Sequence, residues 1–333
     1  MIEIDGSRAG GQLLRTATAL SALTEKPFRI TNIRGARPEP GIKAQHLEGI
    51  KAIAELCNAK VKGLEINSKE LEFYPNKLEE KDLEIKISTA GSIGLVLQAL
   101  LILTPHIKKD IKIKFEGGAT WGKWAPPVVY LERVLFSLLN YDCELEIIKE
   151  GFYPRGAAVV EAILKPMKIK PIKFTERKEI KSVNIISVAS SFFEKAKVAE
   201  RQAEAAQKLL EEKLNKTPFI EIKYSEAISP GSGILAMMRT ENSFIGADLI
   251  GEKGKPAEYI GERTVRDLIK EYSKGVIDRH AADMLLPYMT KNSKIITSDI
   301  THHIMTSSEV IEKFLDIEFK IDKEEKTISC FSH

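Results

Sequence analysis

Cysteine and tryptophan are scarce in this chain of 333 residues, which contains three cysteines and two tryptophans. Cys57, Cys143 and Cys330 are too few and too scattered for a disulfide framework or a zinc knuckle. The sequence therefore predicts a protein of a reducing, intracellular environment whose fold depends on its apolar core rather than on cross-links.

Long apolar runs and an excess of one charge are also missing. The most apolar run, residues 93–103, is far shorter than the roughly 18 residues that can span a bilayer. The 50 basic and 47 acidic side chains leave a formal charge of +3, so no general positive potential favours nucleic acid or a membrane surface. We expect a cytoplasmic protein with no membrane partner, in which any anion site is local.

The same order of strand and helix signals occurs three times. Residues 1–80 predict a strand, a helix over 12–23, a strand over 28–33, a helix over 42–57 and two further strands, and residues 81–165 repeat this order. A third copy starts near Gly275 and predicts helices over 281–289 and 305–314. We expect an α/β (α+β) fold with a large domain of three βαβαββ-like repeats in a pseudo-threefold arrangement.

Residues 181–274 follow a different order. A strand and a long charged helix over 195–214 precede three strands and a closing helix over 262–272, which makes a βαβββα unit. We interpret this unit as a small four-stranded α/β domain inserted into the large domain, which then comprises residues 1–180 and 275–333. An ordinary C-terminal domain is the alternative.

The turn before the second helix of the first copy is rich in arginine. Arg34 and Arg37 flank a turn that Pro38 and Pro40 stiffen, and Gln45 follows in the first turns of the helix. Two guanidinium groups at this spacing could bind a phosphate, which the helix N-terminus also favours. A solvated basic turn is the alternative interpretation.

The equivalent turns of the other two copies carry aromatic rings and imidazoles. Trp121 and Trp124 lie on a Gly-rich loop, where they could stack on a base or close the end of the sheet as a hydrophobic plug. Thr301, His302 and His303 precede the last predicted helix. A neutral imidazole is a nucleophile near pH 7, although a metal ligand or a structural histidine also fits. The three turns together indicate nucleotide and phosphate chemistry.

Specific motifs are distributed over almost the whole chain. They are Asp5-Gly6, Gly10-Gly11-Gln12-Leu13-Leu14-Arg15, Ile33-Arg34-Gly35-Ala36-Arg37, Pro40-Gly41, Gln45-His46-Leu47, Ala90-Gly91-Ser92, Leu97-Gln98, Gly117-Gly118, Ala125-Pro126-Pro127, Gly151-Phe152-Tyr153-Pro154, Val198-Ala199-Glu200-Arg201, Pro230-Gly231-Ser232-Gly233 and His280-Ala281-Ala282-Asp283. By these motifs the chain resembles the RNA 3′-terminal phosphate cyclase family. The resemblance also implies three repeats interrupted by a small α/β domain.

The resemblance implies an ATP-dependent ligase that converts an RNA 3′-phosphate into a 2′,3′-cyclic phosphate through a covalent histidine–AMP intermediate. His303, followed by Thr306, matches the family's nucleotidyl histidine just ahead of a helix, and His302 does not. The positions that match nucleotide contacts are Gln98, Pro126, His280, Ala281, Ala282, Asp283 and Met284. Those that match the RNA-phosphate side are Gln12, Arg15, Arg34, Arg37 and Gln45. ATP, a divalent cation (Mg or Mn) and RNA 3′ ends are the implied cofactors and partners, and a homodimer is compatible with the family.

The chain departs from the family pattern in several places. The opening from Ser7 to Gly11 lacks the acid that usually helps to hold the metal, so the sequence does not identify the metal ligands. Ala157 and Ala158 replace part of a Gly run after Tyr153-Pro154. Met284 stands where the family often has Gln, which implies looser base selectivity. The rival hypothesis is a catalytically silent cyclase-like protein that binds RNA or a ribosome-assembly partner. An enolpyruvyl transferase of similar repeat architecture is a third, more distant alternative.

Overall fold

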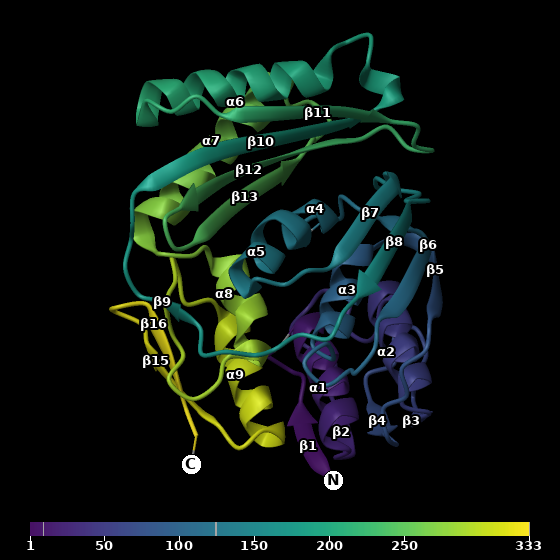
Figure 1. The fold of residues 1–333 in the computed structure, drawn as a ribbon. Coiled ribbons are helices and arrows are strands. Elements are labelled where there is room, and N and C mark those ends of the chain that lie inside the picture. Colours follow the sequence, from purple (N-terminus) through teal and green to yellow (C-terminus); the bar gives the residue numbers. More distant parts are fainter. Residues whose placement is uncertain (9, 124, 333) are drawn as a thin grey trace.

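The computed structural model describes residues 1–8, 10–123 and 125–332, and these residues form a mixed α/β protein. Four sheets of four strands each account for the strands of the described residues, and every sheet contains both parallel and antiparallel pairs. The α/β class expected from the sequence is therefore confirmed. In Figure 1 the β10–β13 sheet and helices α6 and α7 lie above the rest of the molecule, and both chain ends lie at the bottom.

The first two sheets share one strand order. The first pairs its strands in the order β1-β2-β4-β3 and comprises β1 (Ile2–Asp5), β2 (Phe28–Thr31), β3 (Lys60–Lys62) and β4 (Leu71–Tyr74). The second follows β5-β6-β8-β7 and comprises β5 (Leu83–Ser92), β6 (Ile111–Ala119), β7 (Glu144–Lys149) and β8 (Val159–Leu164). The first two strands of each sheet are parallel, and the third and fourth pair antiparallel.

The third sheet follows the same scheme with a strand that the sequence analysis did not predict. Its order is β9-β14-β16-β15, with β9 (Lys173–Phe174), β14 (Lys294–Ile296), β15 (Glu318–Asp322) and β16 (Thr327–Phe331). β9 pairs parallel with β14, so this sheet takes its first strand from the chain before residue 180 rather than from residues after Gly275. β9 contains only two paired residues, so the alternation of apolar and polar side chains that identifies a strand cannot be recognised in its sequence.

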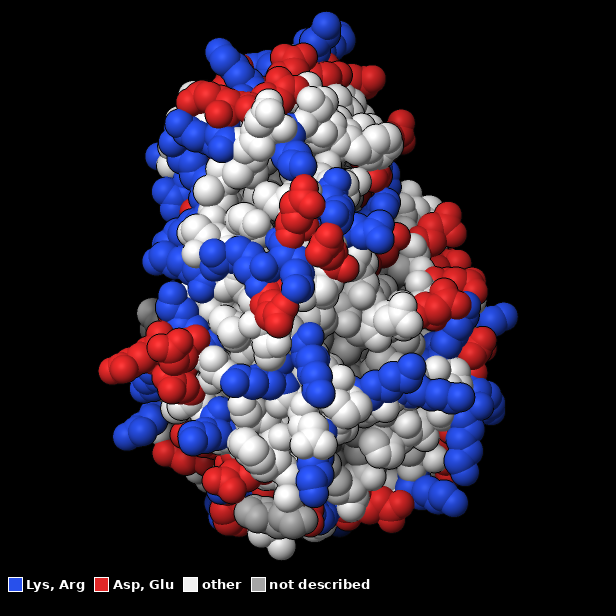
Figure 2. Space-filling model, turned by 60° about the vertical axis from the view of Figure 1, so that its left-hand side comes forward, with Lys and Arg blue, Asp and Glu red and all other residues white. Residues whose placement is uncertain are grey.

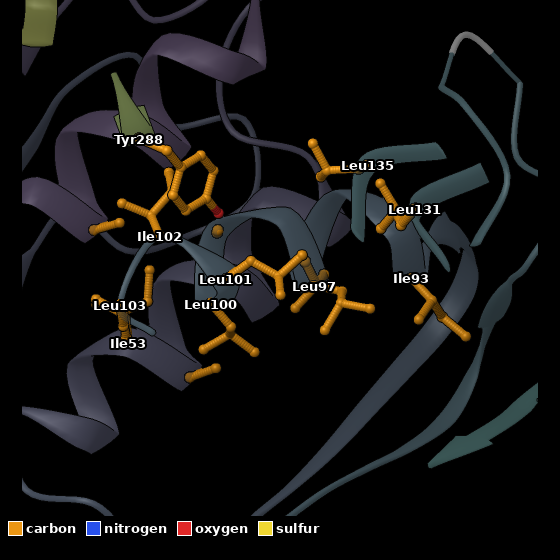
Figure 3. Close-up of a cluster of buried hydrophobic side chains, with 14 of the residues drawn as sticks. Ile53, Ile93, Leu97, Leu100, Leu101, Ile102, Leu103, Leu131, Leu135 and Tyr288 are labelled. Carbon is orange, nitrogen blue, oxygen red and sulfur yellow. The ribbon is translucent and has the colours of Figure 1, made fainter. Parts of the chain in front are cut away.

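Helices pack beside these three sheets. They are α1 (Gly11–Thr24), α2 (Ala44–Leu56), α3 (Ile93–Leu101), α4 (Val128–Tyr130), the π-helical η1 (Leu131–Leu135), α5 (Phe136–Leu139), α8 (Arg279–Leu285), the 3-10 turn η3 (Leu286–Tyr288) and α9 (His302–Phe314). The apolar run at residues 93–103 forms α3 and the turn after it, and its Leu97 and Leu100 are fully buried. Figure 3 shows this run between Ile53 of α2 and Leu131 and Leu135 of η1. A helix that is apolar on all sides is buried in this way.

The fourth sheet belongs to the unit at residues 180–274. Its order β11-β10-β12-β13 comprises β10 (Ile180–Ser190), β11 (Phe219–Ser225), β12 (Ser232–Thr240) and β13 (Phe244–Ile250), with the short turn η2 (Ser191–Phe193) and helices α6 (Val198–Leu214) and α7 (Ala257–Lys274). The predicted βαβββα order is confirmed. α7 begins five residues before the predicted start at residue 262, with Pro256 as its N-cap residue.

The central strand β12 of this fourth sheet is buried on both faces. Ile234, Ala236 and Met238 of β12 pack with α6 and α7 in one apolar cluster, whereas Leu235 and Met237 belong to the large cluster that fills the rest of the molecule. Successive side chains of a strand point to opposite faces, so β12 joins the two cores. The small unit therefore packs directly against the larger body.

The surface mixes charges of both signs, as the near-neutral composition predicts. Figure 2 shows lysines and arginines interspersed with aspartates and glutamates over the face in view. Cys57, Cys143 and Cys330 are all free thiols, which agrees with the prediction of no disulfide framework. Among the described residues, no helix has the length and apolar character needed to span a membrane.

Candidate active site

His303 lies in the first turn of α9. The helix begins at His302, three residues earlier than predicted, and Thr301 caps it by accepting a hydrogen bond from the backbone N–H of Ile304 at 3.2 Å. The apolar periodicity predicts a helix start at Met305 with His303 ahead of it, and this prediction is wrong: a Thr before an apolar-periodic segment is a typical N-cap, so the helix begins directly after Thr301. The cap fixes the backbone that carries the imidazole.

The His303 ring packs against Gly10. A Cβ atom added at Gly10 would lie 2.8 Å from Cε1 of His303 and 3.5 Å from a guanidinium nitrogen of Arg37. Any larger residue at position 10 would displace the ring or the guanidinium. Gly10, Arg37 and His303, which are far apart in sequence, therefore meet at one point.

Burial and nearby cations lower the pKa of His303. Loss of solvent disfavours the protonated ring, and the charges of Arg37, Arg15 and the imidazoles of His302 and His280 act in the same direction. No described residue forms a hydrogen bond to either ring nitrogen of His303, in contrast to the exposed His302, whose Nε2 lies 2.6 Å from the carbonyl oxygen of Arg8. His303 is thus a neutral imidazole with a free lone pair at neutral pH.

A cavity beside α1 collects polar residues from three helices. Gln12 donates a hydrogen bond to Asp283, and the guanidinium of Arg15 lies 3.4 Å from Oε1 of Gln98. Met284 lines the same cavity. Burial lowers the pKa of Arg15 to about 10, and burial raises the pKa of Asp283 to about 6 against the opposing effects of Gln12 and Arg15. Gln12 and Arg15, which were predicted to contact the RNA phosphate, therefore form hydrogen bonds with Asp283 and Gln98, which were predicted to contact ATP.

The arginine turn is braced internally. Arg34 has a positive φ of 54° and donates from its guanidinium to the carbonyl oxygens of Glu39 and Gly41 at 3.0 and 3.1 Å. Arg37 is exposed, and Gln45 packs against Gly91, where an added Cβ would lie 3.2 Å from its Oε1. Arg34 therefore shapes the turn that presents Arg37 to the His303 ring.

His46 is a buried imidazole that the sequence analysis named without assigning it a role. It packs against Gly11, and its Nδ1 accepts a hydrogen bond from the backbone N–H of Lys43 at 3.3 Å. Burial and the charges of Arg15, Arg34 and Lys43 lower its pKa to about 3. No sequence signal separates this histidine from an ordinary helix residue.

A second cleft, of about 960 Å³, separates the small unit from the larger body. Pro126 and His280 line it together with Asp248 of β13. Its volume falls in the range of small-molecule sites. Trp121 lies at the edge of this cleft, is only 2% exposed and packs against Gly233. This burial favours a hydrophobic plug rather than a stacking surface for a base. Trp124 lies outside the described residues.

Helix α8 connects the two cavities. His280 faces the cleft, and burial lowers its pKa although part of the residue is accessible, while Asp283 and Met284 line the polar cavity. Ala281 and Ala282 are both fully buried, so their side chains pack in the core. Asp278 caps the helix by accepting from the backbone N–H groups of His280 and Ala281.

The described residues contain no group of three or more His, Cys, Asp or Glu side chains arranged to hold a metal ion. The charged neighbours of His303 are cations, and the nearby Asp283 is already bonded to Gln12. Mg²⁺ in nucleotide sites is usually held by one or two carboxylates and by phosphates. The side chains described here therefore do not fit a divalent cation by themselves.

A neutral imidazole beside guanidinium groups, together with a cleft large enough for a nucleotide, is typical of an α/β protein that handles phosphate and nucleotide groups. The family model described as RNA 3'-terminal phosphate cyclase matches residues 7–321. The chain belongs to this family.

Curated relatives match nearly the whole chain. The RNA 3'-terminal phosphate cyclase of Pyrococcus abyssi is 42% identical over 332 residues, which cover 97% of this chain and 96% of the relative. That of Thermococcus kodakarensis is 42% identical over 331 residues, with 97% and 95% covered. That of Methanopyrus kandleri is 40% identical over 337 residues, with 96% and 95% covered.

Proposed function

We propose that the protein uses ATP to convert the 3′-terminal phosphate of an RNA into a 2′,3′-cyclic phosphate. The observation that carries the proposal is the His303 imidazole, which is neutral, free of hydrogen bonds from described residues and next to Arg37. Membership of the cyclase family supports the same reaction.

In the first step a ring nitrogen of His303 attacks the α-phosphorus of ATP. A nitrogen–phosphorus bond forms, and the bond to the pyrophosphate oxygen breaks, so that pyrophosphate leaves with its electron pair. Arg15 and Arg37 lie close enough to His303 to lower the pKa of its ring. Their positive charges would stabilise the negative charge that develops on the phosphoryl oxygens. The lowered pKa keeps the attacking nitrogen unprotonated.

In the second step an oxygen of the RNA 3′-phosphate attacks the phosphorus of the histidine-bound AMP and releases His303. Arg37, which is exposed and lies beside the ring, would orient that phosphate, with Gln12, Arg15, Arg34 and Gln45 around it. Finally the vicinal 2′-hydroxyl attacks the 3′-phosphorus, closes the ring and expels AMP. An intramolecular nucleophile of this kind has an effective molarity of ~10⁵ M or more. Only ribose carries this hydroxyl, so the substrate is RNA.

The divalent cation, Mg or Mn, that the family resemblance implies has no cage among the described side chains. No step above is assigned to it. The predicted ATP contacts of Gln98, Pro126, His280, Asp283 and Met284 stay proposals, and Ala281 and Ala282 would contribute only by holding α8 in the core.

The main alternative is a catalytically silent relative that binds RNA or a ribosome-assembly partner. Such a protein would lack the nucleophile, whereas this chain has His303 in the first turn of α9 with Arg37 beside it. The matched relatives also bear the name of the enzyme. Both observations favour the active cyclase.

Covalent labelling tests the proposal. The protein is incubated with α-labelled ATP and a divalent cation, and acid-labile label on the chain is measured. We expect label on the wild type and on His302→Ala, and a loss of at least about 100-fold in His303→Ala. Label that persists in His303→Ala would exclude this histidine as the nucleophile.

We also propose that residues 1–180 and 275–333 form one domain of three repeats in a pseudo-threefold arrangement and that residues 181–274 form an inserted domain. The shared strand order of three sheets and the separate apolar cluster beneath α6 and α7 support this division. The homodimer stays a prediction, which light scattering tests.

A further inference from the structure

Asp248 is an acidic residue on an otherwise apolar strand. Ile245 and Ala247 of β13 pack into the small unit's own core, while Phe244 and Ile250 pack against the large cluster. Because side chains alternate along a strand, Asp248 shares the second face with Phe244, Gly246 and Ile250. The carboxyl group therefore points from the small unit toward the larger body.

No described residue forms a hydrogen bond or an ion pair with the Asp248 side chain. Its neighbour Asp278 is fully buried and fully satisfied, accepting from Tyr130 Oη at 2.6 Å and from the backbone N–H groups of Gly246, His280 and Ala281 at 2.9 to 3.0 Å. Burial, and then the charge of Asp278, raise the pKa of Asp248 to about 7, with Arg279 acting in the opposite direction. Asp278 has an evident structural role, because it caps α8 and connects that helix to Tyr130 and to β13. Asp248 makes no comparable contacts with the described residues.

The Asp248 side chain is partly buried at the cleft and has no partner among the described residues, so its carboxyl group is available to a bound ligand. Asp248 lines the same cleft as Pro126 and His280, the residues on which the proposed nucleotide site rests. A base that lies flat on Pro126 leaves its polar edge free. A carboxylate in the cleft is a hydrogen-bond acceptor for a donor on that edge.

We propose that Asp248 accepts a hydrogen bond from the exocyclic amine of the adenine of ATP and thereby selects adenine over guanine. The inference rests on the proposed function, because it places the base of ATP in this cleft. Guanine carries a carbonyl oxygen where adenine carries the amine, so a carboxylate would face a second acceptor and leave both unpaired.

The test compares ATP with GTP on the wild type and on Asp248→Asn at pH 8, where the wild-type carboxyl is ionised. The readout is the second-order rate of histidine labelling by the α-labelled nucleotide. We expect the wild type to prefer ATP by about 10- to 100-fold, as one lost hydrogen bond implies. In Asp248→Asn the ratio should fall to within about threefold of unity, because a rotated amide offers a donor to the guanine carbonyl.

Two further variants separate this role from a general effect of charge or folding. Glu262→Gln removes an exposed acid of the small unit that lies on α7 outside the cleft, and it should leave the ratio unchanged. Asp248→Leu should raise the KM for ATP about tenfold without any gain for GTP. A ratio in Asp248→Asn equal to that of the wild type would overturn the inference.

Equilibrium binding of AMP and GMP to the same proteins separates failure of the inference from failure of the proposed function. An AMP preference that is lost in Asp248→Asn supports the inference even if no label reaches His303. Equal binding of AMP and GMP by the wild type contradicts it, whether or not the chain is labelled.

Discussion

At the level of single residues, two imidazoles of the site, His46 and His303, share a positive environment. Arg15 lowers the pKa of both His46 and His303. His46 is buried and bonded through Nδ1 to the backbone of Lys43, whereas His303 is half-buried and unbonded at its ring among the described residues. The hydrogen bonding, rather than the charge around them, makes His303 the candidate nucleophile.

The first prediction concerns the charge of Arg37. Its guanidinium disfavours protonation of His303, so Arg37→Gln should raise the pKa of that ring. The proposed nucleophile is the neutral ring, so labelling by ATP should start to fall at a higher pH in the variant than in the wild type as the solution is acidified. Single-turnover labelling between pH 5 and 8 measures this shift.

Arg37→Lys is the matched control, because it keeps the positive charge. Its labelling should follow the wild-type pH profile, while transfer of AMP to RNA should slow about tenfold, since an ammonium group cannot bind a phosphate bidentately. An unchanged pH profile in Arg37→Gln would contradict the electrostatic account of His303.

At the level of elements, helix starts position the chemistry. α9 carries His303 in its first turn behind the Thr301 cap, and α8 carries His280 behind the Asp278 cap. α3, which carries Gln98, is held in place by its buried apolar surface. Its Leu97, Leu100 and Leu101 are fully buried, and burying each of them stabilises the fold by roughly 1.5–3 kcal/mol, so α3 is a rigid support.

The second prediction removes the cap of α9. Thr301→Ala should lower the free energy of unfolding by about 1 kcal/mol, because the backbone N–H of Ile304 loses its acceptor. A loss of about 1 kcal/mol leaves the protein folded, so it does not by itself reduce histidine labelling. We nevertheless expect the labelling rate to fall roughly tenfold, because this turn holds His303 in position. Urea unfolding and labelling rates check the two effects.

Thr301→Ser serves as the control for this cap. Serine keeps the hydroxyl that accepts from Ile304, so both stability and labelling should stay close to those of the wild type. If the serine and alanine variants label at the same rate, the cap does not position the nucleophile.

At the level of the whole molecule, glycines permit close packing between the small unit and the larger body. Gly231 packs against Phe152, Gly233 against Trp121 and Gly246 against Tyr130, with an added Cβ in each case less than 3.0 Å from a ring atom. The cleft that contains Asp248 depends on this contact, because β13 carries both Gly246 and Asp248.

The third prediction tests that contact with a single methyl group. In Gly246→Ala the Cβ would lie 2.7 Å from the Tyr130 ring, so we expect a loss of about 1–3 kcal/mol in the free energy of unfolding and weaker nucleotide binding. Gly49→Ala is the matched control. The Cβ of this alanine would lie 4.0 Å from Val96, which is an ordinary contact. Because alanine favours a helix more than glycine does, the variant should have an unchanged free energy of unfolding or one higher by up to about 1 kcal/mol. Equal stability of the two variants would exclude tight packing at Gly246.

Much of the element order could be predicted from the sequence because it depends on local periodicity. The βαβββα order of the small unit and most of the helices follow from spacing of apolar residues. β9 could not be predicted, since its two paired residues gain their strand character only from β14. Asp248 gave one weak signal, a lone acid in the apolar stretch from Phe244 to Ile250, which does not show what the carboxyl faces.

The sequence by itself determined the family and the candidate residues: the motifs, and His303 rather than His302 as the proposed nucleophile, are predicted from side-chain type and spacing along the chain. Only the tertiary structure decided which of these residues meet. Gly10, Arg37 and His303 come from three separate segments, and the lowered pKa of the imidazole arises from burial and charges that exist only once those segments pack together. Electrostatic and packing energies depend on distances in space, and a linear sequence does not contain those distances.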